Sequence, residues 1–168
     1  MVLFVSGCSD SSTDSNDSNN EYTLVWQDEF EGDSINSANW SFQLGTGSQF
    51  GLTGWGNNEL QYYTDRERNA YLDNGNLVIE AHQESFQGQP YTSARLVTKD
   101  KKVWKYGKIE IKARMPETQG VWPALWMLPQ ENKYGGWPAS GEIDIMELLG
   151  HQPDIVHGTI HFGNSFND

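Results

Sequence analysis

The chain has 168 residues, enough for one domain of ordinary size. Its 11 basic and 23 acidic residues give a formal net charge of −12 and no basic patch is visible, so we expect no nucleic-acid partner. Seven Trp, seventeen Gly and many short alternating runs, without long helical patterns, favour an all-β sandwich or barrel.

Residues 1–8 begin with an apolar run and end at Cys8, the single cysteine, which excludes a disulfide within the chain. Val5-Ser6-Gly7-Cys8 resembles the lipobox of bacterial lipoprotein signal peptides, although no Lys or Arg precedes the short apolar run. The resemblance implies lipidation of Cys8 and a place in the bacterial cell envelope, either anchored at the outer-membrane surface or secreted. The alternative is an incidental cysteine.

Residues 9–20 are all Ser, Thr, Asp or Asn. Such a segment cannot offset its ordering entropy by burial, so we expect a disordered tether. The folded part should then occupy residues 21–168 and meet a membrane only through the lipid anchor. Its first strand is expected at residues 23–27.

Residues 45–56 form a Gly-rich loop with two aromatic side chains, a composition typical of functional loops. The amide of Asn58 follows beside further aromatic residues. Residues 73–76, Asp-Asn-Gly-Asn, predict a tight turn between two strands, and residues 83–91 read as a polar loop. Arg95 lies in a strand expected over residues 93–98.

Residues 108–114 alternate between charged and apolar side chains, which predicts a half-exposed strand ending before a proline. In the next apolar run, residues 121–129, strand spacing would put Trp122, Ala124 and Trp126 on one face. The two indoles would lie about 13 Å apart at roughly 3.3 Å per residue. They are either core residues or a stacking platform for two sugar rings, and the small Ala124 between them favours the platform.

Three carboxylates, Glu142, Asp144 and Glu147, alternate with apolar residues in one run. This period predicts a strand with Glu142 and Asp144 on one side and the isoleucines on a buried face. Strict alternation sends Glu147 to the apolar side, and one extra residue, a β-bulge, returns it to the other two. Since adjacent carboxylates repel, we expect them to serve acid–base chemistry or a metal.

Residues 155–162 predict one more strand, with His157, Thr159 and His161 on one face. The chain offers no further ligand cluster for zinc beside these histidines. Three readings of the carboxylates stay open: a glycosidase, a Ca²⁺ site, or a structural ladder. In a glycosidase, carboxyl groups about 5–5.5 Å apart give retention of configuration through a covalent intermediate. A bulged strand favours that short spacing.

Several segments together resemble family 16 glycoside hydrolases, most closely the laminarinase branch of endo-β-1,3-glucanases. The carboxylate run, Glu-Ile-Asp-Ile-Met-Glu, is similar to the E-x-D-x-x-E signature of that family. Four further segments support the resemblance, in family order: residues 55–64, 105–110, 120–129 and 157–163.

The resemblance implies a β-jelly-roll sandwich of two curved antiparallel sheets with a β-1,3-glucan in the concave cleft. It implies Glu142 as nucleophile, Asp144 as its assistant and Glu147 as acid/base, with no cofactor for catalysis. It also implies the sugar-binding residues Trp122, Trp126, Arg95, Asn58 and His161. Many relatives hold a structural Ca²⁺, for which Glu31 and the carbonyl of Gly75 would match two ligands. We expect a monomer.

Family domains are longer, so we expect this chain to lack the last part of the fold and to be neither stable nor active alone. Two alternatives to a laminarinase stay open. One is a hydrolase of another polysaccharide, such as agar or carrageenan, on the same fold. The other is a non-catalytic β-glucan-binding protein, although such proteins typically lose the catalytic glutamates that are present here.

Overall fold

The computed structural model describes residues 2–4 and 22–163, so Cys8 and the 9–20 linker lie outside the described residues. The chain divides into two units, Met1–Arg114 and Met115–Asp168. Both are built of strands, apart from two short 3₁₀ helices, which confirms the predicted all-β class. No helix in the described ranges is long and apolar enough to cross a membrane.

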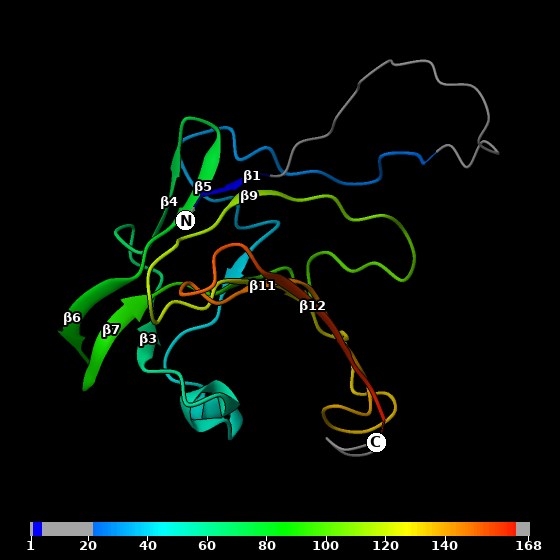
Figure 1. Cartoon of the computed structure of the whole chain (residues 1–168). Coiled ribbons are helices and arrows are strands. Elements are labelled where there is room, and N and C mark those ends of the chain that lie inside the picture. The colour runs from blue at the N-terminus through cyan, green and yellow to red at the C-terminus, as the bar shows by residue number, and fades with distance from the viewer. Residues whose placement is uncertain (1, 5–21, 164–168) are drawn as a thin grey trace. The chain divides into compact units, whose positions relative to one another are not determined.

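The first unit contains three small sheets (Figure 1). The largest has the order β4–β5–β1–β9, the second pairs β2 with β8, and the third has the order β3–β7–β6. The pairing of β3 with β7 is parallel, an exception to the expected antiparallel sheets. The strand bounds in chain order are β1 Val2–Phe4, β2 Ser41–Phe42, β3 Gln61–Tyr63, β4 Ala70–Asp73, β5 Asn76–Ile79, β6 His82–Phe86, β7 Gln89–Ser93, β8 Leu96–Val97 and β9 Lys112–Arg114, and the 3₁₀ helices are η1 Ser48–Phe50 and η2 Thr53–Gly56.

The hairpin of β4 and β5 confirms the turn predicted at residues 73–76. Asp73 pairs with Asn76, and the two residues between them, Asn74 and Gly75, have φ values of 49° and 73°. Positive φ at both central positions is the requirement of a type I′ turn, which Asn-Gly satisfies. β5 brings Leu77 into the core, where it is fully buried.

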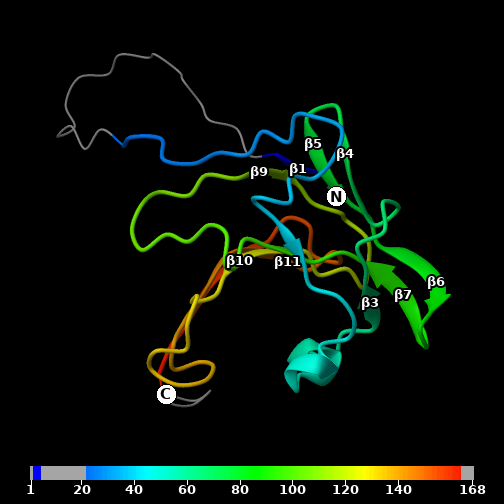
Figure 2. The same cartoon turned by 180° about the vertical axis from the view of Figure 1, so that it is seen from behind.

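Four predicted elements of this unit are wrong or too long. Residues 23–27 are not a strand; there Trp26 instead packs its ring against Trp40 and Trp104 at centroid distances of 6.1 and 5.1 Å. Residues 83–91 are not a loop but the β6–β7 hairpin, visible from behind in Figure 2. The strand expected over 93–98 shortens to β8, and its first residue, Ser93, instead ends β7, where it pairs with Tyr63. The strand expected over 108–114 shortens to β9, the part that pairs with β1.

The second unit is one antiparallel sheet with the order β10–β11–β12. Its strands are β10 Ala124–Met127, β11 Glu142–Leu148 and β12 Val156–His161, and β11 and β12 run side by side in Figure 1. These bounds confirm the strands predicted around the Trp pair, the carboxylates and the histidines. The central strand, β11, is the one that carries all three carboxylates.

The predicted burial of the isoleucines on β11 is wrong for the described chain. Ile143 and Ile145 are 47% and 36% exposed, whereas Asp144 is only 5% exposed. Both isoleucines therefore lie partly at the surface of the described chain. On the opposite side of the strand, the carboxylate of Asp144 is buried.

Candidate active site

A β-bulge in β11 brings the three carboxylates to one face, as the sequence predicts. The pairing with β12 runs Glu142 to His161 and Asp144 to Thr159, and it resumes at Glu147 with His157 after a register shift. Directly opposed residues in an antiparallel pair project to the same side of the sheet. Since the three β12 partners are two residues apart, their side chains share one face, and so do the carboxylates opposite them.

The pairing of β11 with β10 records the same extra residue. Ala124 lies opposite Glu147, Trp126 lies opposite Asp144, and the register shifts between Leu125 and Trp126. The side chain of Trp126 therefore projects on the carboxylate face. This register confirms the prediction that Ala124 and Trp126 lie on one face.

Two indole N–H groups donate to the outer carboxylates. Trp122, which precedes β10 and is 50% exposed, donates from Nε1 to Oε1 of Glu147 at 3.0 Å. Trp137 donates from Nε1 to Oε2 of Glu142 at 2.5 Å. Each glutamate thus has one oxygen held by a neutral donor, and neither is paired with a cation in the described interactions.

Asp144 interacts with the predicted residue His161. The carboxylate Oδ2 of Asp144 lies 3.0 Å from Nε2 of His161, and Asp144 is buried. Ligand atoms of Glu142, Asp144 and His161 all lie within 4.8 Å of one another, a spacing that could also hold a metal ion. The indole donor at Glu142 and the exposed flanking isoleucines are unlike the loop of oxygen ligands that Ca²⁺ prefers.

The electrostatics of the cluster act mainly on Glu142. Burial raises the pKa of its carboxyl, the hydrogen bond from Trp137 opposes the rise, and the negative charge of Asp144 adds to it. The net pKa of Glu142 lies above the ordinary value for a glutamate.

Arg95 and Asn58 lie in the first unit and have surroundings of their own there. Nε of Arg95 donates to Oε1 of Gln43 at 2.6 Å, and its guanidinium lies 4.3 Å from the centre of the Trp55 ring. Asn58 is exposed and has a φ of 57°. Their part in ligand binding stays a prediction.

Trp137 is the residue of the site that the sequence reasoning missed. It lies five positions before β11 in a Gly-rich segment, residues 135–141, that has no strand or helix period. The signal in the sequence was the Trp itself. A large aromatic side chain in a Gly-rich segment directly before the carboxylate strand is expected to contact that strand.

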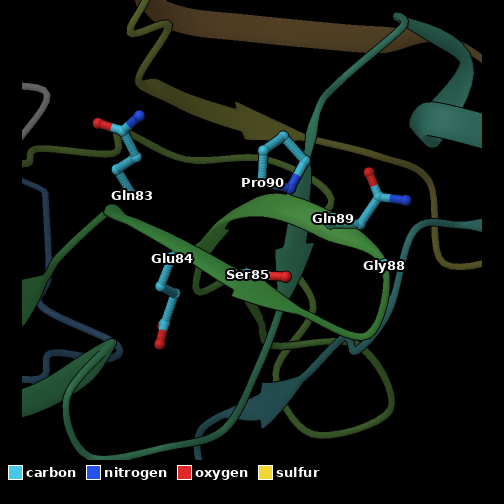
Figure 3. Close-up of a pocket in the computed structure, with 6 residues that line it drawn as sticks. All are labelled: Gln83, Glu84, Ser85, Gly88, Gln89 and Pro90. Atoms are coloured by element: carbon cyan, nitrogen blue, oxygen red, sulfur yellow. The ribbon is translucent and has the colours of Figure 1, made fainter.

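A hollow in the first unit contains none of the predicted residues. Figure 3 shows it at the β6–β7 hairpin, where the side chains spread apart from the ribbon. It is lined by Gln83, Glu84, Ser85, Gly88, Gln89 and Pro90. Glu84 is the one carboxylate of its lining, and it is bound by Arg66, Arg68 and Thr92.

Comparison with known proteins assigns these features to one family. The family described as "Glycosyl hydrolases family 16" matches residues 54–168. A beta-glucanase of Rhodothermus marinus is 48% identical over 165 residues, which covers 96% of this chain and 56% of that protein. Glucan endo-1,3-beta-glucosidase A1 of Niallia circulans is 45% identical over 152 residues, covering 85% of this chain and 22% of that protein.

The solved structures agree with the sequences. The laminarinase from Rhodothermus marinus superposes with a TM-score of 0.79 at 50% identity, over 84% of this chain and 56% of that one. This match confirms the predicted fold class, the all-β jelly-roll sandwich of the family. The chain therefore spans little more than half the length of the Rhodothermus relatives.

The arrangement predicts how Glu142 responds to its neighbour. In Asp144→Asn the negative charge that raises the pKa of Glu142 is gone, so ionisation of Glu142 becomes easier and its pKa falls. Carboxyl ¹³C NMR titration of the full-length protein measures this directly. A pKa for Glu142 that stays unchanged or rises in Asp144→Asn would contradict the described electrostatics, and Glu131→Gln, at an exposed position outside β11, should leave it unchanged.

Proposed function

Because the chain belongs to glycosyl hydrolases family 16, we propose that the protein is a retaining endo-β-1,3-glucanase of the laminarinase type. Its substrates are laminarin-like or mixed-linkage β-glucans. The single observation that carries the proposal is the bulge of β11, which sets Glu142, Asp144 and Glu147 on one face. A glycosidase needs two carboxyl groups converging on one bond, and this face supplies them.

The roles are those that the resemblance to family 16 glycoside hydrolases implies for these three positions. Glu142 attacks the anomeric carbon, and the glycosidic bond breaks with its electron pair going to the leaving oxygen. Glu147 gives its proton to that oxygen. Water, deprotonated by Glu147, then attacks the same carbon and releases Glu142 as a carboxylate. Asp144, whose Oδ2 lies 3.0 Å from Nε2 of His161, lies beside Glu142 and assists it.

Two observations favour a neutral glucan as the substrate. Trp126 projects on the carboxylate face and Trp122 lies beside Glu147 with half of its surface exposed, so both indoles can stack on sugar rings. The net charge of −12 disfavours a sulfated polymer such as carrageenan. The relatives named as acting on β-1,3-glucan support the same substrate.

The test compares three variants of the full-length protein on laminarin by release of reducing sugar. Glu142→Gln and Glu147→Gln should each lower kcat/KM by about 10³-fold or more, because each removes a group that makes or breaks a bond. Glu131→Gln removes an exposed carboxylate of the same unit and should keep activity within about twofold.

Three outcomes would overturn the proposal. Retention of more than a tenth of the activity in Glu142→Gln would show that Glu142 is not the nucleophile. Faster hydrolysis of agar or carrageenan than of laminarin would point to another polysaccharide. Binding of laminarin by the wild-type protein without any release of sugar would make it a binding protein.

We also propose a structural Ca²⁺ near Glu31 and Gly75. A Cβ added to Gly75 would lie 3.9 Å from the carbonyl oxygen of Glu29, so the 73–76 turn approaches the segment that carries Glu31. In the next residue, Oδ1 of Asn76 is buried and has no hydrogen-bond partner within the described residues. A buried oxygen without a donor beside this turn suits a hard cation such as Ca²⁺, so these residues fit the ion.

Chelation tests this site without any assay of activity. EDTA should lower the Tm of the full-length protein by several degrees, because an ion that binds only the folded state stabilises it, and excess Ca²⁺ should restore the Tm. Glu31→Gln should be less sensitive to EDTA than the wild type. An equal Tm with EDTA and with Ca²⁺ would refute the proposal.

Anchoring through a lipid on Cys8, a place at the outer surface of a bacterial envelope, and a monomeric state are proposals that rest on the sequence alone. Globomycin-sensitive processing and loss of membrane association in Cys8→Ser would support the anchor.

A further inference from the structure

Trp137 contacts two residues of the carboxylate face at once. Its Nε1 donates to Oε2 of Glu142, and its ring centroid lies 5.4 Å from that of His161 with the planes inclined by 48°. Glu142 and His161 are opposite each other in the β11–β12 register. The indole therefore bridges both strands at the end of the sheet where the predicted nucleophile lies, while 51% of its surface stays exposed.

These contacts close a ring around the predicted nucleophile. Trp137 touches Glu142 and His161, and His161 in turn interacts with Asp144 at 3.0 Å. Asp144 is two positions from Glu142 on the same face of β11. A side chain fixed from two directions loses rotamer freedom, and the two oxygens of Glu142 become inequivalent: Oε2 is held by the indole and Oε1 is not held by it.

This inequivalence has a use in both steps of the proposed reaction. With Oε2 held, Oε1 is the oxygen that forms the bond to the anomeric carbon. In the glycosyl-enzyme, Oε2 is the ester carbonyl oxygen, which can still accept from Nε1. When water attacks the anomeric carbon and the ester C–O bond breaks, its electron pair returns to the carboxylate, and a donor already aimed at Oε2 stabilises that charge.

We infer that Trp137 is a positioning residue of the reaction: it holds Oε2 of Glu142, selects Oε1 as the attacking oxygen and assists the departure of the carboxylate in the second step. The inference rests on the proposed function, since it needs Glu142 to be the nucleophile. It adds a residue that neither the carboxylate motif nor the predicted sugar-binding set contains.

The experiment removes the N–H and keeps the ring. Trp137→Phe retains an aromatic ring against His161 but has no donor for Glu142. We expect kcat on laminarin to fall by about tenfold with KM changed less than threefold, because a lost hydrogen bond to a charged group acts on the bond-making steps. The acid limb of the kcat/KM profile should move to higher pH, because the bond that opposes the raised pKa of Glu142 is gone. The titratable groups that face Glu142 are Asp144 on β11 and His161 on β12, and both are unchanged in the variant.

A matched control separates this effect from a general loss of an indole. Trp122→Phe removes the donor to Glu147 instead, and it should leave the acid limb where it is in the wild type. If Trp137→Phe fails to fold, as judged by circular dichroism, 3-benzothienylalanine at position 137 gives a ring of nearly the same shape without the N–H.

The outcomes distinguish this inference from the function on which it rests. A wild-type protein without activity on laminarin would sink the proposed function. An active wild type with a Trp137→Phe or benzothienyl variant whose kcat and acid limb are unchanged would overturn the inference alone. A rise in KM without any change in kcat would overturn it as well, and would make Trp137 a sugar-stacking residue.

Discussion

One extra residue in the central strand of the second unit determines the chemistry available to this protein. In a regular strand, five positions separate Glu142 from Glu147 and place them on opposite faces. The β-bulge between Asp144 and Glu147 absorbs one position, so that the ladder with β12 resumes with Glu147 on the face of the other two carboxylates. Without this irregularity the strand would present one predicted catalytic glutamate to each side of the sheet.

Bringing three carboxylates together has an electrostatic cost, and the surrounding side chains offset it in three ways. His161 lies against the buried Asp144, Trp137 donates to Glu142, and Trp122 donates to Glu147. The two indoles are neutral donors, so they bind the outer carboxylates without cancelling their negative charge. An arginine in the same place would cancel it. Burial raises the pKa of Glu142 although the hydrogen bond from Trp137 lowers it, and Glu147 lies beside the half-exposed ring of Trp122. A face built this way suits the proposed proton exchange with a sugar.

Sequence reasoning predicted the parts of the structure that follow from strict local patterns. The turn at residues 73–76 has Asn-Gly where positive φ is required. The bulge was predicted because Glu147 does not fit the alternation that Glu142 and Asp144 follow. Elements set by distant partners were predicted poorly. Residues 23–27 contain an apolar run that was read as a strand, yet Trp26 packs against other aromatic rings. Residues 108–111 have no ladder partner in the described ranges.

The β6–β7 hairpin was missed for a different reason. Its strands are polar on both faces, so they carry no hydrophobic period, and its Gln87-Gly88 turn is weaker as a signal than Asn-Gly, although both residues have positive φ. Trp137 was missed because a Gly-rich segment has no period from which a direction can be read. Its role depends on where the chain turns before β11, which only the folded structure specifies.

The anomeric configuration of the first product tests the central claim most directly. If the bulge sets Glu142 and Glu147 about 5–5.5 Å apart, hydrolysis proceeds with retention. Proton NMR of laminarin digested by the full-length protein should then show β-anomeric reducing ends first, with the α-anomer growing only by mutarotation. Initial appearance of the α-anomer would mean inversion and wider-set carboxylates, and it would contradict this account of the strand.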